Sequence, residues 1–340
     1  MKTRNTVLLA ATLSLLLSGC ATTPSAKKLP KWVLHPDSKY SSVRYMTAVG
    51  EGDTLRAAEG HAFNRLAGRF KTRVQASERV SDRAEETFGK KLSFEKTSEY
   101  LSDIQLETDE TLLNVETLEQ YHDAKGRVYA LVALNRADTA QLYKEKIAEN
   151  AQRIRSLMGG DPYKLKAYAK ARLALALGLA NQQLIDRLSI IHHDSATMAN
   201  LPYELDLLRM RAAQASHSIR FKVSMQGNQS AAFGQQVSSV MTRRGFTESA
   251  VSDLRISGTV SIQDIHFPRK DINTVRFQLL LNVNDQLGKT LITLKKDGRE
   301  AHLSQENARR RAERTVNQLI EKELNARLNV LLDHLAGGES

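Results

Sequence analysis

The sequence predicts an α+β fold made of two small α+β modules that are linked by an α-helical pair. Strand-like alternation and helix-like spacing of apolar residues occur together in residues 32–158 and again in residues 217–340. Between them, residues 159–216 carry only helix-like spacing. Hydrophobic residues make up 41% of the 340 residues and charged residues 26%, which is typical of globular domains. We therefore expect each module to fold around a core.

The first module begins with a strand and an alanine-rich helix. Residues 43–49 alternate with period two, and Gly50-Glu51-Gly52 predicts a tight turn that uses the access of glycine to positive φ. Asp53 or the residue after it is a good N-cap for a helix whose apolar positions recur up to residue 74. The glycines also raise a nucleotide-binding hypothesis, which fails because Leu55 replaces the third glycine of that motif.

A hairpin and a further helix complete the first module. The hairpin has strands over residues 113–121 and 127–135, and an amphipathic helix follows over residues 138–158. Two glycines then end that helix. Asp161-Pro162 is expected to supply the N-cap and first position of the next one.

The linker and the second module continue the alternation of element types. The linker is predicted as two helices over residues 163–188 and 201–215. The second module reads strand, helix, three strands and a long helix, over residues 219–225, 231–244, 254–267, 273–284, 289–296 and 304–335. The apolar stripe of the last helix is predicted at Ala308, Ala312, Val316, Leu319, Leu324, Leu328, Leu331 and Leu335.

The N-terminus predicts export and lipid attachment. Residues 1–19 have a positively charged start and a short apolar run, as a signal peptide does, and Ser18 and Gly19 stand directly before Cys20. This pattern is the bacterial lipobox. We expect cleavage between Gly19 and Cys20, a diacylglycerol on the thiol and an N-acyl chain on the new amine, which suffice for stable anchoring without a spanning helix. Residues 20–31 form the lipidated tether, and Ala21 favours the outer membrane over the inner one.

Cysteine and charge counts exclude several classes of protein. With one cysteine, the chain has no internal disulfide and no cysteine-based zinc or iron–sulfur site. The formal net charge is +11, from 49 Lys and Arg against 38 Asp and Glu. We nevertheless predict no nucleic-acid binding, because an exported protein does not meet the chromosome and its basic residues are not interleaved with aromatic ones.

Four segments of the first module resemble a known family. They are Pro30-x-Trp32-Val33, the strand and turn at residues 45–52, the alanine-rich helix after it, and residues 126–132. Together they resemble the LPP-twenty family of bacterial outer-membrane lipoproteins over roughly residues 30–150. The resemblance implies a small α+β module found in cell-envelope lipoproteins and in flagellum-associated outer-membrane components. It implies no catalytic residues.

Arg309, Arg310, Arg311 and Arg314 form the densest basic cluster and are candidates for contact with an anion or a partner. They fall in the first turns of a helix, where cations oppose the macrodipole. The alternative is a solvated face compensated by nearby glutamates. Conversely, residues 101–120 carry six acids and no Lys or Arg, so charge is segregated along the chain, which suits assembly with a partner or another copy.

The sequence offers no catalytic or metal-binding pattern. His192-His193-Asp194 lacks the spacing of a metal motif and is better interpreted as a polar loop between helices, and no nucleophile stands beside a base. We expect no cofactor beyond the acyl chains. The predicted function is a non-enzymatic, periplasm-facing component of the outer membrane that takes part in envelope assembly. One alternative is a regulator or carrier that binds peptidoglycan or lipid. The other is a periplasmic enzyme, which a deep pocket lined by several ionisable groups would favour.

Overall fold

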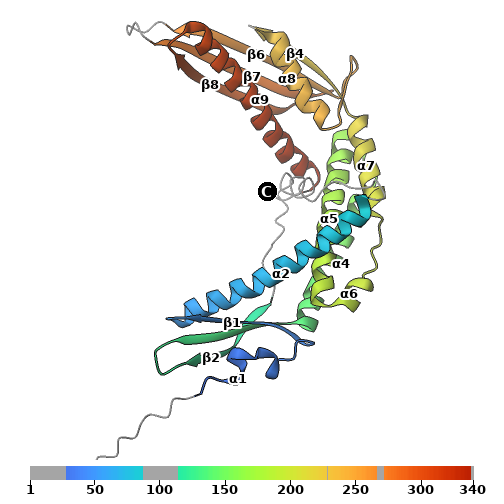
Figure 1. The fold of residues 1–340 in the computed structure, drawn as a ribbon. Coiled ribbons are helices and arrows are strands. Elements are labelled where there is room, and N and C mark those ends of the chain that lie inside the picture. Colours follow the sequence, from blue (N-terminus) through green and yellow to red (C-terminus); the bar gives the residue numbers. More distant parts are fainter. Residues whose placement is uncertain (1–27, 87–113, 228, 266–271, 338–340) are drawn as a thin grey trace, which may run out of the picture. The chain divides into compact units, whose positions relative to one another are not determined.

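The computed structural model describes residues 28–86, 114–227, 229–265 and 272–337. Contacts divide the chain into two compact units (Figure 1): unit 1 consists of residues 1–69 and 114–135, and unit 2 of residues 70–113 and 136–340. Each unit contains helices and one sheet, so the predicted α+β class is confirmed.

Unit 1 is built on a three-stranded antiparallel sheet in the order β1-β3-β2. The strands are β1 (Tyr45–Gly52), β2 (Val115–His122) and β3 (Val128–Asn135). Its helical segments are α1 (Lys31–Leu34), the short 3-10 turn η1 (Pro36–Ser38) and the part of α2 (Leu55–Glu86) up to Arg69.

The central strand β3 is buried along almost its whole length because both faces of the sheet are covered. Trp32 of α1 packs with Leu131 on one face. Ala58 of α2 packs with Val128 and Ala130 on the other. The predicted hairpin is therefore present, and its return strand forms the core of the unit.

Side chains of α2 protect the exposed edge of β1. Three donors lie one helical turn apart on α2 and bond to the carbonyl oxygens of three alternate residues of β1. Each donor contacts one carbonyl. The pairs are His61 Nδ1 with Glu51 (3.1 Å), Arg65 with Val49 (2.9 Å) and Arg69 with Thr47 (3.3 Å). These contacts fix the register between helix and strand and satisfy acceptors that an edge strand otherwise presents to other chains.

The predicted glycine turn at residues 50–52 is wrong. Gly50 and Gly52 lie inside β1, and neither is among the described glycines with positive φ. Their small size is needed for a different reason. A Cβ at Gly50 would overlap the carbonyl oxygen of Ala58 and the backbone nitrogen of Ala62, and one at Gly52 would stand 2.8 Å from the nitrogen of Ala58. Helix α2 therefore approaches β1 backbone to backbone.

Glu119 ties the N-terminal segment to β2 at a register shift of that strand. Its carboxylate forms an ion pair with Lys39 and accepts a hydrogen bond of 2.6 Å from the hydroxyl of Tyr40. The bonds from Lys39 and Tyr40 lower the pKa of Glu119 below its ordinary value of 4.5. Burial and the bond to Glu119 raise the pKa of Tyr40 from 10.0 to about 12.

We predict that Glu119→Gln lowers the free energy of unfolding of unit 1 by about 1.5 to 3 kcal/mol near neutral pH, the usual contribution of hydrogen bonds to a charged group. A depressed carboxyl pKa stabilises the fold above pH 4.5, so the difference from wild type should shrink as pH falls through the lower folded pKa. The raised Tyr40 pKa stabilises the fold below pH 10 and is lost as pH rises towards 12. The only tryptophan, Trp32, is buried in unit 1, and its fluorescence during urea unfolding measures both effects.

Glu116→Gln, on the same strand, is the matched control and should leave the urea midpoint unchanged. A Glu119→Gln deficit that stays constant from neutral pH down to pH 3 would contradict the assigned role of the carboxylate.

Unit 2 combines a helical layer with a five-stranded sheet. The helices preceding the sheet are α4 (Arg136–Leu157), α5 (Lys164–Ile191), α6 (His193–Thr197) and α7 (Leu205–Ser218). The sheet has the order β5-β4-β6-β7-β8, in which β4 runs parallel to both of its neighbours and the other pairs are antiparallel. Its strands are β4 (Arg220–Gly227), β5 (Thr247–Glu248), β6 (Leu254–Ile265), β7 (Asn273–Asp285) and β8 (Thr290–His302).

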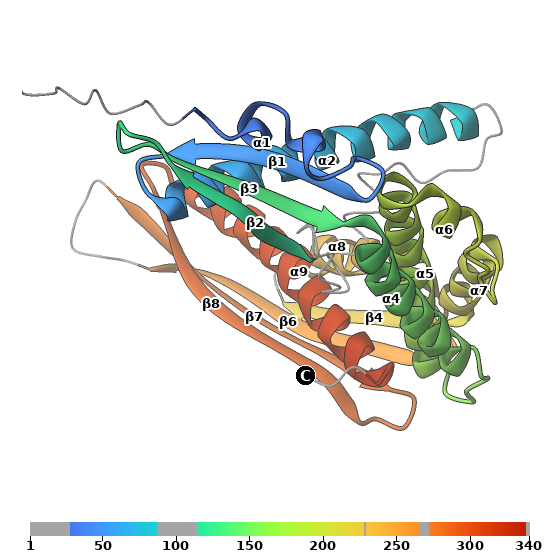
Figure 2. The ribbon, with the colours of Figure 1, turned by 90° about the horizontal axis from the view of Figure 1, so that it is seen from below.

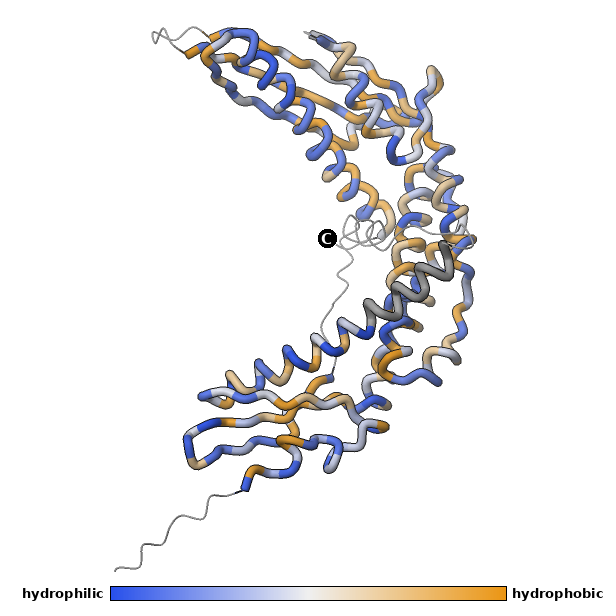
Figure 3. Tube along the Cα trace, in the orientation of Figure 1, coloured by the Kyte–Doolittle hydropathy of each residue, from blue (hydrophilic) through white to orange (hydrophobic). Residues whose placement is uncertain are grey.

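Two helices, α8 (Ser230–Arg243) and α9 (Gln305–Leu335), cover one face of this sheet (Figure 2). Apolar and polar residues alternate along its strands, as the colouring in Figure 3 shows, so the apolar side chains gather under these helices. The predicted order of long elements is present. The short strand β5 was not predicted, because two residues carry no periodicity.

The buried stripe of α9 differs in part from the predicted one. Ile320 and Leu332 are fully buried, whereas Leu319, Leu331 and Leu335 are only partly buried against the core. The buried residues recur every fourth position, which winds the stripe about 40° around the helix axis per step. The helix contacts β8 through Thr315 and Glu323 and then α5 through Asp333, and a stripe placed on one fixed face does not include this rotation.

The start of α5 and the packing of α4 also differ from expectation. Helix α5 begins at Lys164, and Asp161 is not its N-cap but accepts a hydrogen bond of 3.1 Å from the nitrogen of Tyr163 in the preceding turn. Helix α4, predicted as the end of the first module, groups with unit 2. It packs along α5, where Asn150 donates a 2.9 Å hydrogen bond to the buried amide of Asn181.

Candidate functional site

The predicted lipidation and cleavage positions, Cys20 and Gly19, lie outside the described residues. Across the ranges that the structure describes, we found no helix with the length and hydropathy required to cross a membrane.

The arginine cluster at the start of α9 is engaged within the protein. Arg309 holds Asp264 of β6 through two bonds of 3.0 and 2.5 Å, which raise the pKa of the guanidinium. Arg310 pairs with Glu306 at 2.5 Å, one turn earlier on the same helix. The other two donate to backbone carbonyls, Arg311 to Ala301 and Arg314 to Arg310. Acids beside this cluster thus offset part of its charge.

The histidine pair has a local structural role. Nδ1 of His192 accepts a 3.3 Å hydrogen bond from the nitrogen of Ser195, which makes His192 the N-cap of α6. Among the described residues, no three His, Cys, Asp or Glu side chains are grouped so that they could hold a metal ion.

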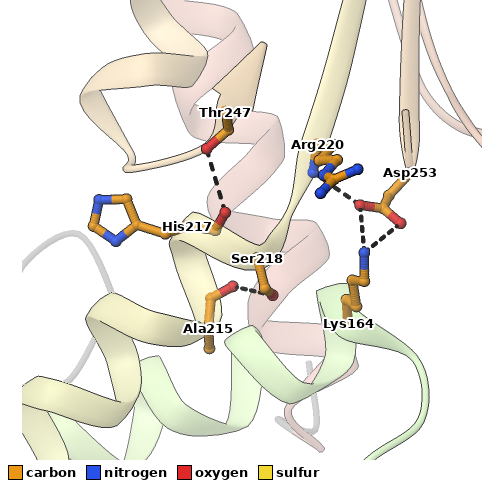
Figure 4. A network of polar contacts seen from close by, with 7 residues as sticks. All are labelled: Lys164, Ala215, His217, Ser218, Arg220, Thr247 and Asp253. Carbon is orange, nitrogen blue, oxygen red and sulfur yellow. Dashed lines mark hydrogen bonds and ion pairs between the residues drawn. The ribbon is translucent and has the colours of Figure 1, made fainter. Parts of the chain in front are cut away.

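Asp253 organises the junction between the helical layer and the sheet (Figure 4). Its carboxylate accepts bonds from Lys164 at the start of α5, at 3.0 and 3.1 Å, and from the nitrogen of Arg220 at 2.8 Å. Thr247 of β5 donates to the carbonyl of His217 at the end of α7. These hydrogen bonds hold α5 and α7 against the start of the sheet. We therefore assign the network a structural role.

The face of the sheet that points away from α8 and α9 is the strongest candidate for function. We call it the outer sheet face. The cross-strand register assigns to it Lys222, Ser224 and Gln226 of β4; Arg255, Ser257, Thr259, Ser261, Gln263 and Ile265 of β6; Thr274, Arg276, Gln278, Leu280, Asn282 and Asn284 of β7; and Thr293, Lys295, Asp297, Arg299 and Ala301 of β8. It is rich in hydroxyl and amide groups, and Leu280, 37% exposed, is its most exposed large apolar side chain.

Besides Arg220, which begins β4 beside the short edge strand β5, five basic side chains and one acid stand on the outer sheet face. All five bases are exposed: Lys222, Arg255, Arg276, Lys295 and Arg299. The register places Lys222 directly opposite Arg255, and Arg276 directly opposite Arg299. Like charges in opposite positions destabilise a sheet, so the fold carries an electrostatic cost here. The acid, Asp297, offsets it only weakly, at 3.9 Å from Arg276.

Charges on the helical side of the same sheet are arranged in the opposite way. Lys296, which points inward from β8, bonds Glu323 of α9 at 2.9 Å. Arg243 of α8 bonds Glu321 at 2.9 Å. These two basic residues therefore have acidic partners. By contrast, Lys222, Arg255, Lys295 and Arg299 form no ion pair within the described residues.

Two surface hollows border this sheet. One, of about 330 Å³, lies in the outer sheet face and is lined there by Arg276, Lys295, Thr259, Ser261 and Gln278 together with Asp297. The other, of about 590 Å³, lies between β4 and α8 and is lined mainly by serine, threonine and glutamine. Its single ionisable residue is Glu248. Only the first hollow brings cationic groups together.

Sequence reasoning missed the outer sheet face because its bases are far apart in the chain. No two of the five are adjacent, so no local cluster marks them, whereas four arginines within six positions stand out at the start of α9. The usable signal was the period-two position of each base within a predicted strand. The strand register was also needed to bring them together.

Comparison with known proteins supports a lipoprotein. Residues 30–135 match the family model described as LPP20 lipoprotein, so the resemblance noted in the sequence is confirmed over these residues. No curated protein sequence matches the chain.

Several solved structures are similar to this chain. A secreted protein of Helicobacter pylori aligns with a TM-score of 0.48 and 14% identity, over 84% of this chain and 98% of that one. A minor lipoprotein of Acinetobacter baumannii aligns with a TM-score of 0.24 and 10% identity, over 34% and 90%. A protein of Caulobacter crescentus described as a lipoprotein aligns with 0.25 and 12%, over 38% and 98%. At these TM-scores the structures carry no argument about function.

Proposed function

We propose that the chain is a lipid-anchored lipoprotein of the outer membrane that faces the periplasm and acts, without catalysis, as a structural or assembly component of the cell envelope. One observation carries the proposal. The region that matches LPP20 lipoproteins begins at residue 30, directly after a lipobox cysteine and a polar tether. Flagellum-associated assemblies of the outer membrane are one setting that this role includes.

A second candidate is a module that binds peptidoglycan or lipid. The outer sheet face favours it, because its exposed cations lack acidic partners across most of the face. An enzymatic role has less support, since the residues that line the hollow with cationic groups include no nucleophile hydrogen-bonded to a base.

We predict that Cys20→Ser abolishes incorporation of labelled palmitate and removes the protein from the outer-membrane fraction, because the thiol is the site of diacylglycerol attachment. Metabolic labelling and membrane fractionation of the full-length protein measure this. Ser18→Ala keeps a small residue before the cysteine and should leave both readouts unchanged. Unchanged outer-membrane attachment of Cys20→Ser would overturn the anchor.

The assembly role is tested separately by crosslinking the wild-type protein in intact cells. Recovery of specific envelope proteins, or of a crosslinked dimer, supports it. A chain that yields only monomer at every crosslinker concentration argues against it.

A further inference from the structure

We propose that the outer sheet face docks on the anionic phosphate headgroups of the phospholipid bilayer that carries the lipid anchor. The inference names the partner of the face described above. It rests on the proposed lipid anchor for its setting in the cell, although the docking itself is tested in protein that has no acyl chain.

The charge pattern indicates that the partner is an anion. Two like-charged pairs, Lys222 with Arg255 and Arg276 with Arg299, stand directly opposite each other on a face that holds a single acid. Elsewhere around this sheet, Lys296 and Arg309 each bond an acidic side chain. An anionic surface in contact with this face would attract the bases and offset the repulsion between them.

The chemistry of the hollow fits a phosphate-bearing headgroup. Arg276 and Lys295 supply charged donors, and Thr259 and Ser261 supply hydroxyl groups beside them. A guanidinium and an ammonium are the groups that bind phosphate oxygens best in proteins. None of the side chains of the outer sheet face is aromatic, so it offers no ring for a sugar to stack on, which favours headgroups over a glycan.

The lipid anchor supplies the reason that a weak electrostatic contact is enough. The tether over residues 21–31 reaches at most about 40 Å when fully extended. The tether leads into unit 1, and unit 2, which carries the outer sheet face, is part of the same anchored chain. Anchoring therefore gives the face a higher effective concentration at its own bilayer than a free protein would have. Several lysines and arginines near an anionic leaflet, each contributing modestly, then suffice to orient the domain.

The test uses the mature chain from residue 20 onward with Cys20→Ser, so that vesicle binding measures the protein surface alone. It should co-sediment with phosphatidylglycerol-containing vesicles and not with pure phosphatidylcholine vesicles, and added salt should weaken binding. Each basic residue near an anionic surface strengthens binding roughly fivefold, so Arg276→Gln with Arg299→Gln should lower the partition coefficient roughly 25-fold. Asp297→Asn should raise it roughly fivefold by removing the single acid of the face.

The matched control is Arg310→Gln with Arg314→Gln, which removes the same charge from the exposed face of α9 and should change binding less than roughly twofold. Thermal unfolding should show that Arg276→Gln with Arg299→Gln is folded, because it relieves a repulsion. Equal binding to phosphatidylcholine, or unchanged binding of that variant, would overturn the proposal. So would binding to isolated peptidoglycan with no binding to vesicles, which would assign the face to the cell wall. None of these failures affects the Cys20 anchor, which palmitate labelling tests independently.

Discussion

Gly50→Ala is expected to lower the free energy of unfolding of unit 1 by about 3 kcal/mol or more. The added Cβ would overlap the carbonyl oxygen of Ala58 and the nitrogen of Ala62 and would stand 2.9 Å from the Cα of Ala62. All of these atoms belong to the backbone of α2. No side-chain rotation can therefore relieve the clash, and the helix must move away from β1.

Movement of α2 would also break its contacts along the edge of β1. The side chains of Arg65 and Arg69 reach the carbonyls of Val49 and Thr47, so a displaced helix loses these bonds as well. Urea unfolding followed by Trp32 fluorescence measures the loss. It should appear as a lower midpoint with a similar slope.

Gly60→Ala is the matched control and lies on α2, the helix that Gly50 of β1 contacts. A Cβ at Gly60 meets no atom within 4 Å, and the residue is exposed in the interior of α2. Alanine is favoured over glycine in helices by about 1 kcal/mol, so this variant should be more stable than wild type. Two glycine-to-alanine changes ten positions apart thus have opposite signs. A Gly50→Ala protein as stable as wild type would disprove the close approach of helix and strand.

The glycines at 50 and 52 show what sequence alone could not decide. A residue with positive φ and a residue that another backbone approaches closely are both usually glycine. The sequence Gly50-Glu51-Gly52 is compatible with either reason. The small alanine side chains of α2 let a helix lie close to a sheet, and Ala58 and Ala62 are fully buried. The missing information was that Gly50 faces those alanines, which depends on the pairing of β1 with β3 across a long intervening segment.

In unit 2 as well, some features could be predicted from the sequence and others could not. Element types in unit 2 followed from periodicity, because strands of eight to thirteen residues and a helix of 31 residues carry strong patterns. The neutralisation of Arg309 did not, since Asp264 lies 45 positions away on β6. The position of Arg276 opposite Arg299 likewise depends on the register of the hairpin formed by β7 and β8. A shift of one residue would place the two side chains on opposite faces of the sheet.

An ion pair with a buried guanidinium links α5 to α9 in unit 2. The side chain of Arg172 is 5% exposed and lies 2.8 Å from the carboxylate of Asp333, which is 28% exposed. It also donates to Asn329 at 3.3 Å, and Arg244 donates to the same amide oxygen at 2.8 Å. Burial raises the pKa of Asp333, and the nearby Arg172 acts in the opposite direction. The charge of Arg172 is therefore removed from water, and the carboxylate of Asp333 is its acidic partner.

Asp333→Ala should lower the free energy of unfolding of unit 2 by about 3 kcal/mol, because it leaves the cation of Arg172 in the core without its carboxylate. The double variant Arg172→Met with Asp333→Ala should be more stable than Asp333→Ala alone, since a flexible apolar side chain of similar length then fills the space without a charge. Urea unfolding followed by far-ultraviolet circular dichroism measures both, because most helices belong to unit 2. Glu306→Ala, which removes the exposed partner of Arg310, is the control and should cause little measurable change. If Asp333→Ala matched that control, or if the double variant were the least stable of the three, the pair would not be the link between α5 and α9 that the structure shows.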